Sequence, residues 1–170
     1  GRVLGLPYPG GAALDRLAAD FFASGREPSF TLPSAAIAGD TLDFSFSGLK
    51  TCVLDRVNHL RMKGEEPDHA ELAAALTISI ADSVVRRLDR ALQDTGARVL
   101  IAAGGATANS HLRRAITGLA ERRGVKLYLP PLRYCGDNGA MIAAQAYFEL
   151  REGNVAPASL NGVATGASEL

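Results

Sequence analysis

The chain has 170 residues, 47% of them hydrophobic, and 18 Lys and Arg balance 18 Asp and Glu, so that the formal net charge is zero. This length and composition allow one hydrophobic core and exclude a disordered or fibrous chain. The zero net charge excludes a globally basic protein that attracts nucleic acid through excess positive charge.

The first part of the chain predicts two helices and one strand. Apolar side chains at helical spacing in residues 14–22 predict a helix that ends near Gly25. In residues 42–46 apolar and polar side chains alternate with a period of two, which predicts a half-buried strand. Residues 49–60 again have apolar side chains at helical spacing and predict a further short helix.

A long helix is predicted next. Apolar side chains repeat every four residues from Leu72 to Leu92, and Gly96 ends the run. Pro67 is suited to the first turn of this helix, where its missing N–H group costs nothing.

The remaining elements alternate between strands and helices. Residues 99–103 predict a short buried strand and residues 125–129 a second strand, with a helix over residues 112–120 between them and a last helix over residues 138–152. This order indicates an α/β layer with parallel strands. Ligands in such sheets bind at the carboxyl ends of the strands.

A glycine turn follows the first of these strands. Gly104 and Gly105 allow a close approach of ligand to backbone, and the helix start behind them offers free N–H groups to an anion. Asn109 has both a donor and an acceptor for a ribose or phosphate group. An ordinary tight turn with Asn109 as helix cap explains the same residues equally well.

Asp137 lies between the second strand and the last helix. Taken alone it is better explained as a helix N-cap than as a metal ligand, since catalytic metal sites use about three protein ligands. The Ser-Gly-Leu-Lys turn at residues 47–50 predicts an edge hairpin with a solvated lysine, and an anion contact is the alternative. Ser45 and Ser47 have no base partner that would make either a nucleophile.

The remaining polar residues predict surface positions and a reducing compartment. Cys52 and Cys135 have neither disulfide nor metal spacing, no signal peptide opens the chain, and no uncharged run is long enough for a membrane span. We therefore expect a cytoplasmic protein without membrane contact. We also expect surface or capping histidines and solvated basic helix faces at these positions: His59, His69, His111, Arg86, Arg87, Arg90, Arg113, Arg114, Arg122, Arg123 and Lys126.

Four segments together resemble the tRNA N6-adenosine threonylcarbamoyltransferase family (TsaD, formerly called O-sialoglycoprotein endopeptidase). They are LGLPYPGG (residues 4–11), FSFSGLKT (44–51), GGATANSHLR (104–113) and CGDNGAMIA (135–143). The resemblance extends to about Glu152. Gly136 departs from the family's common Thr, and Ala106-Thr107 replaces Val-Ala or Val-Ser.

The resemblance implies an actin/Hsp70-like fold built on ribonuclease H-like cores, with this chain as the C-terminal lobe of a two-lobed enzyme. We expect that lobe in residues 1–152, formed by a helix and hairpin segment (1–62) and an α/β core (67–152), and a poorly ordered tail in residues 153–170. The family's N-terminal half, with its His-x-x-x-His metal ligands, is absent from this sequence. We therefore expect the chain to be inactive alone.

The implied reaction is the transfer of a threonylcarbamoyl group from threonylcarbamoyl-adenylate to N6 of adenosine 37 in tRNAs that read ANN codons. By resemblance, Gly11 and Asp15 contact the nucleoside of the adenylate or of ATP, and Gly104, Gly105 and Asn109 enclose it. Asp137 matches the family's ligand to a divalent metal, iron or zinc. The resemblance identifies no general base. The partners that it implies are tRNA, TsaB- and TsaE-type subunits and the N-terminal half of the same protein.

Three alternatives remain open. A metallo-endopeptidase would need the absent histidine pair. A non-catalytic scaffold or nucleotide-binding subunit of the same complex would not be expected to keep the Asp-Asn-Gly of residues 137–139. A sugar-kinase-like phosphotransferase would need a catalytic Asp that the sequence does not offer.

Overall fold

Helix α3 (His69–Thr95, 27 residues) is the longest element of the described residues, and most of the others pack around it. Its N-cap is Asp68, whose carboxylate accepts two hydrogen bonds of 3.0 Å from first-turn N–H groups. These bonds, together with the guanidinium of Arg26, hold the pKa of Asp68 below its usual value. Gly96 ends the helix as predicted, at φ 64°. Pro67 precedes the cap, so its predicted place in the first turn is wrong.

The computed structural model describes residues 1–35, 37, 39 and 41–161, which form two units, Gly1–Gly136 and Asp137–Leu170. The elements besides α3 are, in chain order, the 3₁₀ turn η1 (Arg2–Leu4), α1 (Gly10–Ala23), α2 (Ser47–Met62), β1 (Val99–Ile101), η2 (Gly105–Ala108), α4 (Ser110–Arg123), β2 (Lys126–Tyr128), η3 (Leu132–Tyr134) and α5 (Gly139–Arg151).

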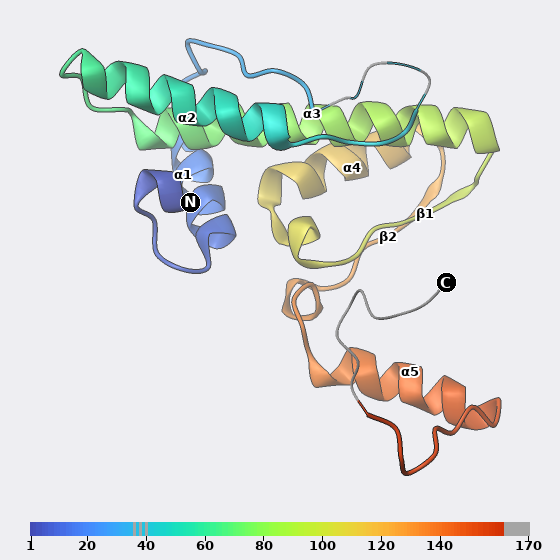
Figure 1. Ribbon diagram of the computed structural model, residues 1–170. Helices are drawn as coiled ribbons and strands as arrows, with labels where there is room; N and C mark the ends of the chain where they lie inside the picture. The colour runs from blue at the N-terminus through green and yellow to red at the C-terminus, as the bar shows by residue number, and fades with distance from the viewer. Residues whose placement is uncertain (36, 38, 40, 162–170) are drawn as a thin grey trace. The chain divides into compact units, whose positions relative to one another are not determined.

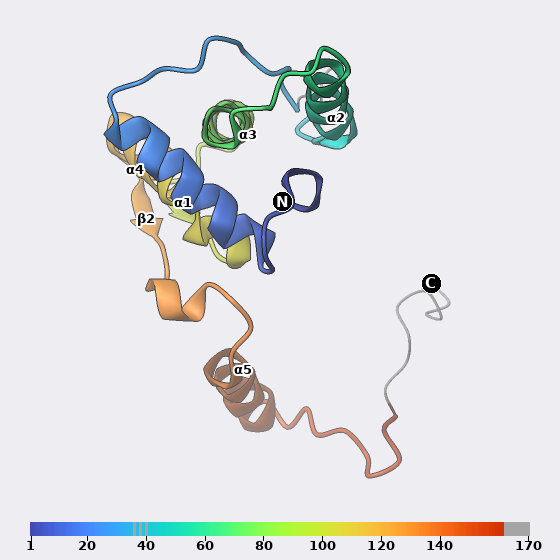
Figure 2. The same cartoon turned by 90° about the vertical axis from the view of Figure 1, so that its left-hand side faces the viewer.

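Helix α1 packs closely on the first half of α3. Ala18 and Phe21 of α1 are almost fully buried against Ala73 and Ala74 of α3, and the small alanine side chains let the two helices approach each other. Figures 1 and 2 show α3 between α2 on one side and α1 with α4 on the other. The contact with α2 is made by Val57, which packs against Leu72 and the N-terminal segment of the chain.

The strands β1 and β2 pair in parallel, with Leu100 opposite Leu127. One face of this pair, including those two leucines, packs on Ala81 of α3 and on Ile116 of α4. On the other face Ile101 is 73% exposed, and Val99 and Tyr128 are about half exposed. The prediction of parallel strands is confirmed, but β1, which was predicted to be buried, is covered on one face only.

The predicted strand over residues 42–46 is wrong. Only Phe44 forms a bridge, and residue 45 donates a backbone hydrogen bond of 2.8 Å to the carbonyl of Ala35. The predicted hairpin is absent as well, because residues 47–50 form the first turn of α2, which Leu49 anchors in the core. The period-two pattern therefore has no strand partner among the described residues.

The second unit contains α5, which confirms the predicted last helix to within one residue at each end and has no buried residue. Residues 153–161 contain turns at residues 153 and 158–159 but no helix or strand, and residues 162–170 of the predicted tail lie outside the described part of the chain. The α/β class is thus confirmed by helices on a small parallel sheet.

Candidate functional site

Asp15 joins α1 to the beginning of α4. Its Oδ1 accepts hydrogen bonds of 2.9 Å from both the backbone N–H and the hydroxyl of Ser110, 95 positions away. A carboxylate at a helix N-terminus is stabilised by the free N–H groups and the positive end of the helix dipole. Gly11 lies one turn earlier on α1, so that these two candidate residues lie on the same side of the helix.

Asn109 caps the same helix. Its Oδ1 accepts a 2.8 Å hydrogen bond from the N–H of Leu112, and within the described residues its Nδ2 has no hydrogen-bond partner. The first turn of α4 has three N–H groups without a helical partner, those of Ser110, His111 and Leu112. Asp15 accepts from the first and Asn109 from the third, so that only the N–H of His111 has no acceptor within the described residues. The helix start is therefore not the open anion cradle that the sequence suggested.

The glycine turn was predicted to lead directly into the helix. Instead, the 3₁₀ turn η2 (residues 105–108) lies between Gly104 and α4. Gly104 has φ 88°, a conformation that favours glycine. Apart from the adjacent residues in the chain, no atom of the described residues lies within 4 Å of the position that a Cβ would take at Gly104 or Gly105, so a ligand can reach the backbone there. The Thr107 hydroxyl donates to the carbonyl of Gly104 at 2.8 Å and closes the turn.

Arg113 stabilises the glycine turn through hydrogen bonds of its side chain. The sequence did not predict this role. Its guanidinium donates to the carbonyl of Thr107 at 3.0 Å and to the carbonyl of Pro130 in the loop after β2. The buried Cys135 adds weaker contacts, 3.5 Å from the Thr107 hydroxyl and 3.8 Å from the Arg113 guanidinium. No local pattern distinguishes Arg113 from its neighbour Arg114, since the partners are distant in sequence.

The basic clusters are therefore only partly solvated. Arg113 and Arg87 are half-buried, and Arg87 donates to the carbonyls of Ile37 and Thr41. Both were predicted on solvated helix faces, which is wrong because each guanidinium donates hydrogen bonds to backbone carbonyls of other segments.

A cavity of about 570 Å³ opens beside the junction of α1 and α4. Asp15 and Leu132 line it together with one face of α4. Its volume lies within the range of small-molecule sites, roughly 300–1,000 Å³. The structure thus places Asp15 and Ser110 at a cavity, with Asn109 adjacent in the chain, while Gly11, Gly104 and Gly105 do not line it.

His111 is neither a surface nor a capping residue, contrary to the prediction. Its ring is half-buried and stacks on Phe22 of α1, with the centroids 5.1 Å apart. Burial lowers the pKa of His111 and Arg114 lowers it further, while Asp82 and Asp15 act in the opposite direction.

Asp137 does not cap α5. The cap is Asn138, whose Oδ1 accepts a 3.0 Å hydrogen bond from the N–H of Met141. Asp137 is exposed, and nowhere in residues 1–35, 37, 39 and 41–161 do three His, Cys, Asp or Glu side chains form a group that could hold a metal ion. The described helices also include none with the length and apolarity of a membrane span.

The structure is that of an α/β protein with a ligand-accessible turn after its first strand. This class is defined by the parallel strand pair, the glycine turn and helix α4, whose N-terminus is bound by Asn109 and Asp15. The family model of tRNA N6-adenosine threonylcarbamoyltransferase (TsaD) matches residues 1–144, and the chain belongs to this family.

Curated relatives have the same name. The protein of Latilactobacillus sakei subsp. sakei (strain 23K) is 43% identical over 165 residues, which are 96% of this chain and 46% of that protein. The protein of Moorella thermoacetica is 40% identical over 162 residues, 95% of this chain and 46% of its own length. A Clostridium botulinum protein (strain 657 / Type Ba4) is 38% identical with the same coverage. The chain spans about half the length of these relatives.

Proposed function

We propose that this chain provides one wall of the adenylate site of a tRNA N6-adenosine threonylcarbamoyltransferase, the enzyme of t6A synthesis on tRNAs that read ANN codons. Family membership supports the reaction. The observation that supports the site is the hydrogen bonding of Asp15 to Ser110, which joins two of the candidate segments, α1 and the start of α4.

In this proposal the glycine turn and Asn109 hold the adenylate or ATP. The exposed backbone at Gly104 and Gly105 has no neighbour within 4 Å at the Cβ positions, so the ligand can lie against it. The Nδ2 of Asn109 has no partner within the described residues and can donate to the ligand while Oδ1 keeps the cap. Gly11 and the Oδ2 of Asp15 approach the nucleoside from α1.

The chemical task of these residues is alignment. The adenylate is a good leaving group, so the enzyme must chiefly place the N6 amine against the threonylcarbamoyl carbonyl and stabilise charge on the carbonyl oxygen. A fixed wall supports this task. Asp15 joins α1 to α4, Arg113 joins α4 to the glycine turn through Thr107, and Asn109 fixes the first turn of α4. We assign no general base.

We further propose the actin/Hsp70-like, ribonuclease H-like fold of a two-lobed enzyme, in which this chain is the C-terminal lobe. The parallel unit β1-α4-β2 supports this fold. One face of the strand pair is exposed and apolar, as expected if further parts of the protein cover it. TsaB- and TsaE-type subunits, tRNA and the N-terminal half are the proposed partners, and the cytoplasm is the proposed location.

Asp137 is the proposed contribution of this chain to an iron or zinc site. One exposed carboxylate does not fit such an ion by itself, since the described residues supply no other ligand beside it. The histidine pair would have to come from the N-terminal half. We therefore derive no reaction step through a metal.

The test combines this chain with the N-terminal half of the Moorella thermoacetica relative, and t6A is measured in tRNA by mass spectrometry. We expect modification only on mixing, and we expect Asp137→Ala to abolish it. Asp55→Ala, at an exposed carboxylate of α2, is the matched control and should retain activity. Equal activity of both variants would remove Asp137 from the site. A mixture of two folded halves that binds adenylate and forms no t6A would contradict the proposed function.

A further inference from the structure

Residues 24–35, which follow α1, form an arch along α3 that is hydrogen-bonded to this helix at three points. Three hydrogen bonds connect it to the helix: Ser29 N–H to Glu71 Oε1 at 2.7 Å, Ser79 hydroxyl to Pro33 carbonyl at 2.7 Å, and Ala35 N–H to Ser83 Oγ at 2.9 Å. The bond between Ala35 and Ser83 is buried, and the bond between Ser79 and Pro33 is partly buried, so water competes little for either. The arch is therefore held in one position without a ligand.

A cavity of about 520 Å³ lies between the arch, α3 and the end of α1. Its apolar wall includes Phe22, Phe30 and Ile78, and its charged residues are Arg26, Glu27, Asp82 and Arg86. A preformed cavity of this size with an apolar wall and a few polar groups has the general character of a small-molecule site.

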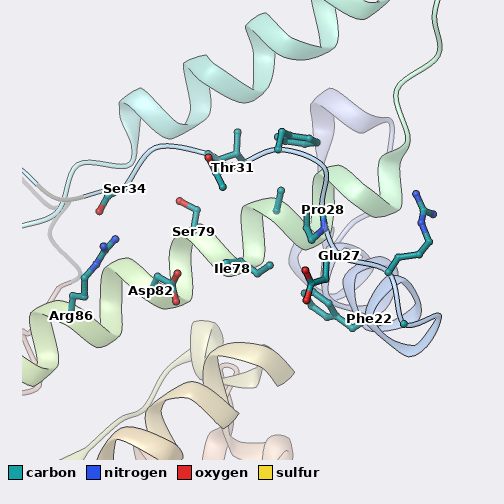
Figure 3. Close-up of a pocket in the computed structure, with 14 residues that line it drawn as sticks. Phe22, Glu27, Pro28, Thr31, Ser34, Ile78, Ser79, Asp82 and Arg86 are labelled. Carbon is teal, nitrogen blue, oxygen red and sulfur yellow. The ribbon is translucent and has the colours of Figure 1, made fainter.

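Two carboxylates in this cavity, Glu27 and Asp82, have no strong partner, although Asp82 lies close enough to His111 to act on its pKa. Within the described residues neither Glu27 nor Asp82 has a hydrogen bond or ion pair. Figure 3 shows both carboxylates directed toward Ile78, one from each side. The arrangement is an apolar strip with a negative charge at each end.

The two arginines do not neutralise these charges directly. Arg26 forms an ion pair with Asp68 at 2.9 Å and lies over the ring of Phe21. Figure 3 shows the side chain of Arg86 extending toward Ser34, and no ion pair joins it to Asp82 within the described residues. Arg86 therefore lowers the negative potential of the cavity without occupying the space between the carboxylates.

We propose that this cavity binds an aliphatic diamine or polyamine. Each ammonium group pairs with one carboxylate, and the methylene chain lies on Ile78 and beside the rings of Phe22 and Phe30. An anion is disfavoured by the two carboxylates, and a metal ion is disfavoured by the apolar side chain between them. This cavity shares no lining residue with the cavity at Asp15 and Ser110.

The test is a titration of the chain with diamines of four to eight carbons, followed by the ¹³C-methyl resonance of Ile78. We expect an optimum at one chain length and a dissociation constant on the order of 0.1–1 mM, because exposed ion pairs are weak. Hexylamine should bind more weakly than 1,6-diaminohexane, and 1,6-hexanediol more weakly still. Equal binding of the diol and the diamine would overturn the proposal.

Isosteric substitutions supply the controls. Asp82→Asn and Glu27→Gln should each weaken diamine binding about threefold, and Arg86→Gln should strengthen it, because only a cationic ligand gains from the loss of Arg86. Asp55→Asn on α2 should leave it unchanged. All four positions are exposed, so the melting temperatures should match that of the unaltered chain. Weaker binding in Arg86→Gln would show that the ligand is an anion or a zwitterion and would overturn the proposal.

Discussion

Asn109 has two separable tasks, and replacing it with Ala or with Ser distinguishes them. The Oδ1 atom caps α4 through the 2.8 Å hydrogen bond to Leu112, and Nδ2 is the proposed donor to the adenylate. Ala removes both functions. Ser is as good an N-cap as Asn but has no amide donor.

The magnitudes follow from these contacts. Loss of the cap in Asn109→Ala should lower the free energy of unfolding by about 1 kcal/mol, and Asn109→Ser should change it by only a few tenths. Loss of one neutral hydrogen bond to the ligand is worth about 1 kcal/mol, which corresponds to roughly fivefold weaker binding in both variants.

Two assays check this. Urea unfolding followed by circular dichroism gives the stability of the chain, and calorimetry with ATP on the chain combined with its N-terminal half gives the affinity. Asn109→Asp is a third variant: it keeps the cap, but places a carboxylate beside the phosphate and should bind more weakly than Ala. If Asn109→Ser kept full affinity, Asn109 would be only a cap. If it lost as much stability as Ala, the assigned cap geometry would be wrong.

Three further outcomes are expected. Asp15→Asn should lower the free energy of unfolding by about 1–2 kcal/mol, and a double-mutant cycle with Ser110→Ala should show a coupling of at least about 0.5 kcal/mol; additivity would contradict the junction. Burial lowers the pKa of His111, so its neutral form stabilises the fold above the unfolded pKa of about 6.5 and this contribution is lost as pH falls below it. His111→Gln should therefore flatten the decline in stability between pH 7 and 5, and an unchanged slope would refute the assignment. Ile101→Lys should reduce concentration-dependent self-association in light scattering without lowering stability, because the side chain is 73% exposed; unfolding of this variant would mean that Ile101 is buried.

The helices and the order of the strands could be predicted because local patterns determine them. The long helix between Asp68 and Gly96 has a cap and a stop in the sequence itself. The false strand at residues 42–46 shows the limit of such patterns. Alternating side chains indicate only that a strand is possible, whereas a strand forms only where another segment offers unpaired N–H and C=O groups.

The candidate site could be predicted only in part. The φ of 88° at Gly104 and the cap at Asn109 belong to local conformations that Gly and Asn favour. The bond between Asp15 and Ser110 joins residues 95 positions apart. Likewise, the partners of Arg113 become neighbours only after β2 has paired with β1. These contacts depend on tertiary packing, which no local pattern specifies.

Helix α1 borders both cavities. Asp15 lines the one beside α4, and Phe22 lines the one beneath the arch. The two residues are seven positions apart, about 10 Å along one helix, and they contact the adjacent Ser110 and His111 of α4. A ligand that tilts α1 in one cavity would therefore displace a lining residue of the other. Thermodynamic reciprocity then requires that each ligand change the affinity of the other by the same factor, so a measurement at either cavity reports the coupling between them.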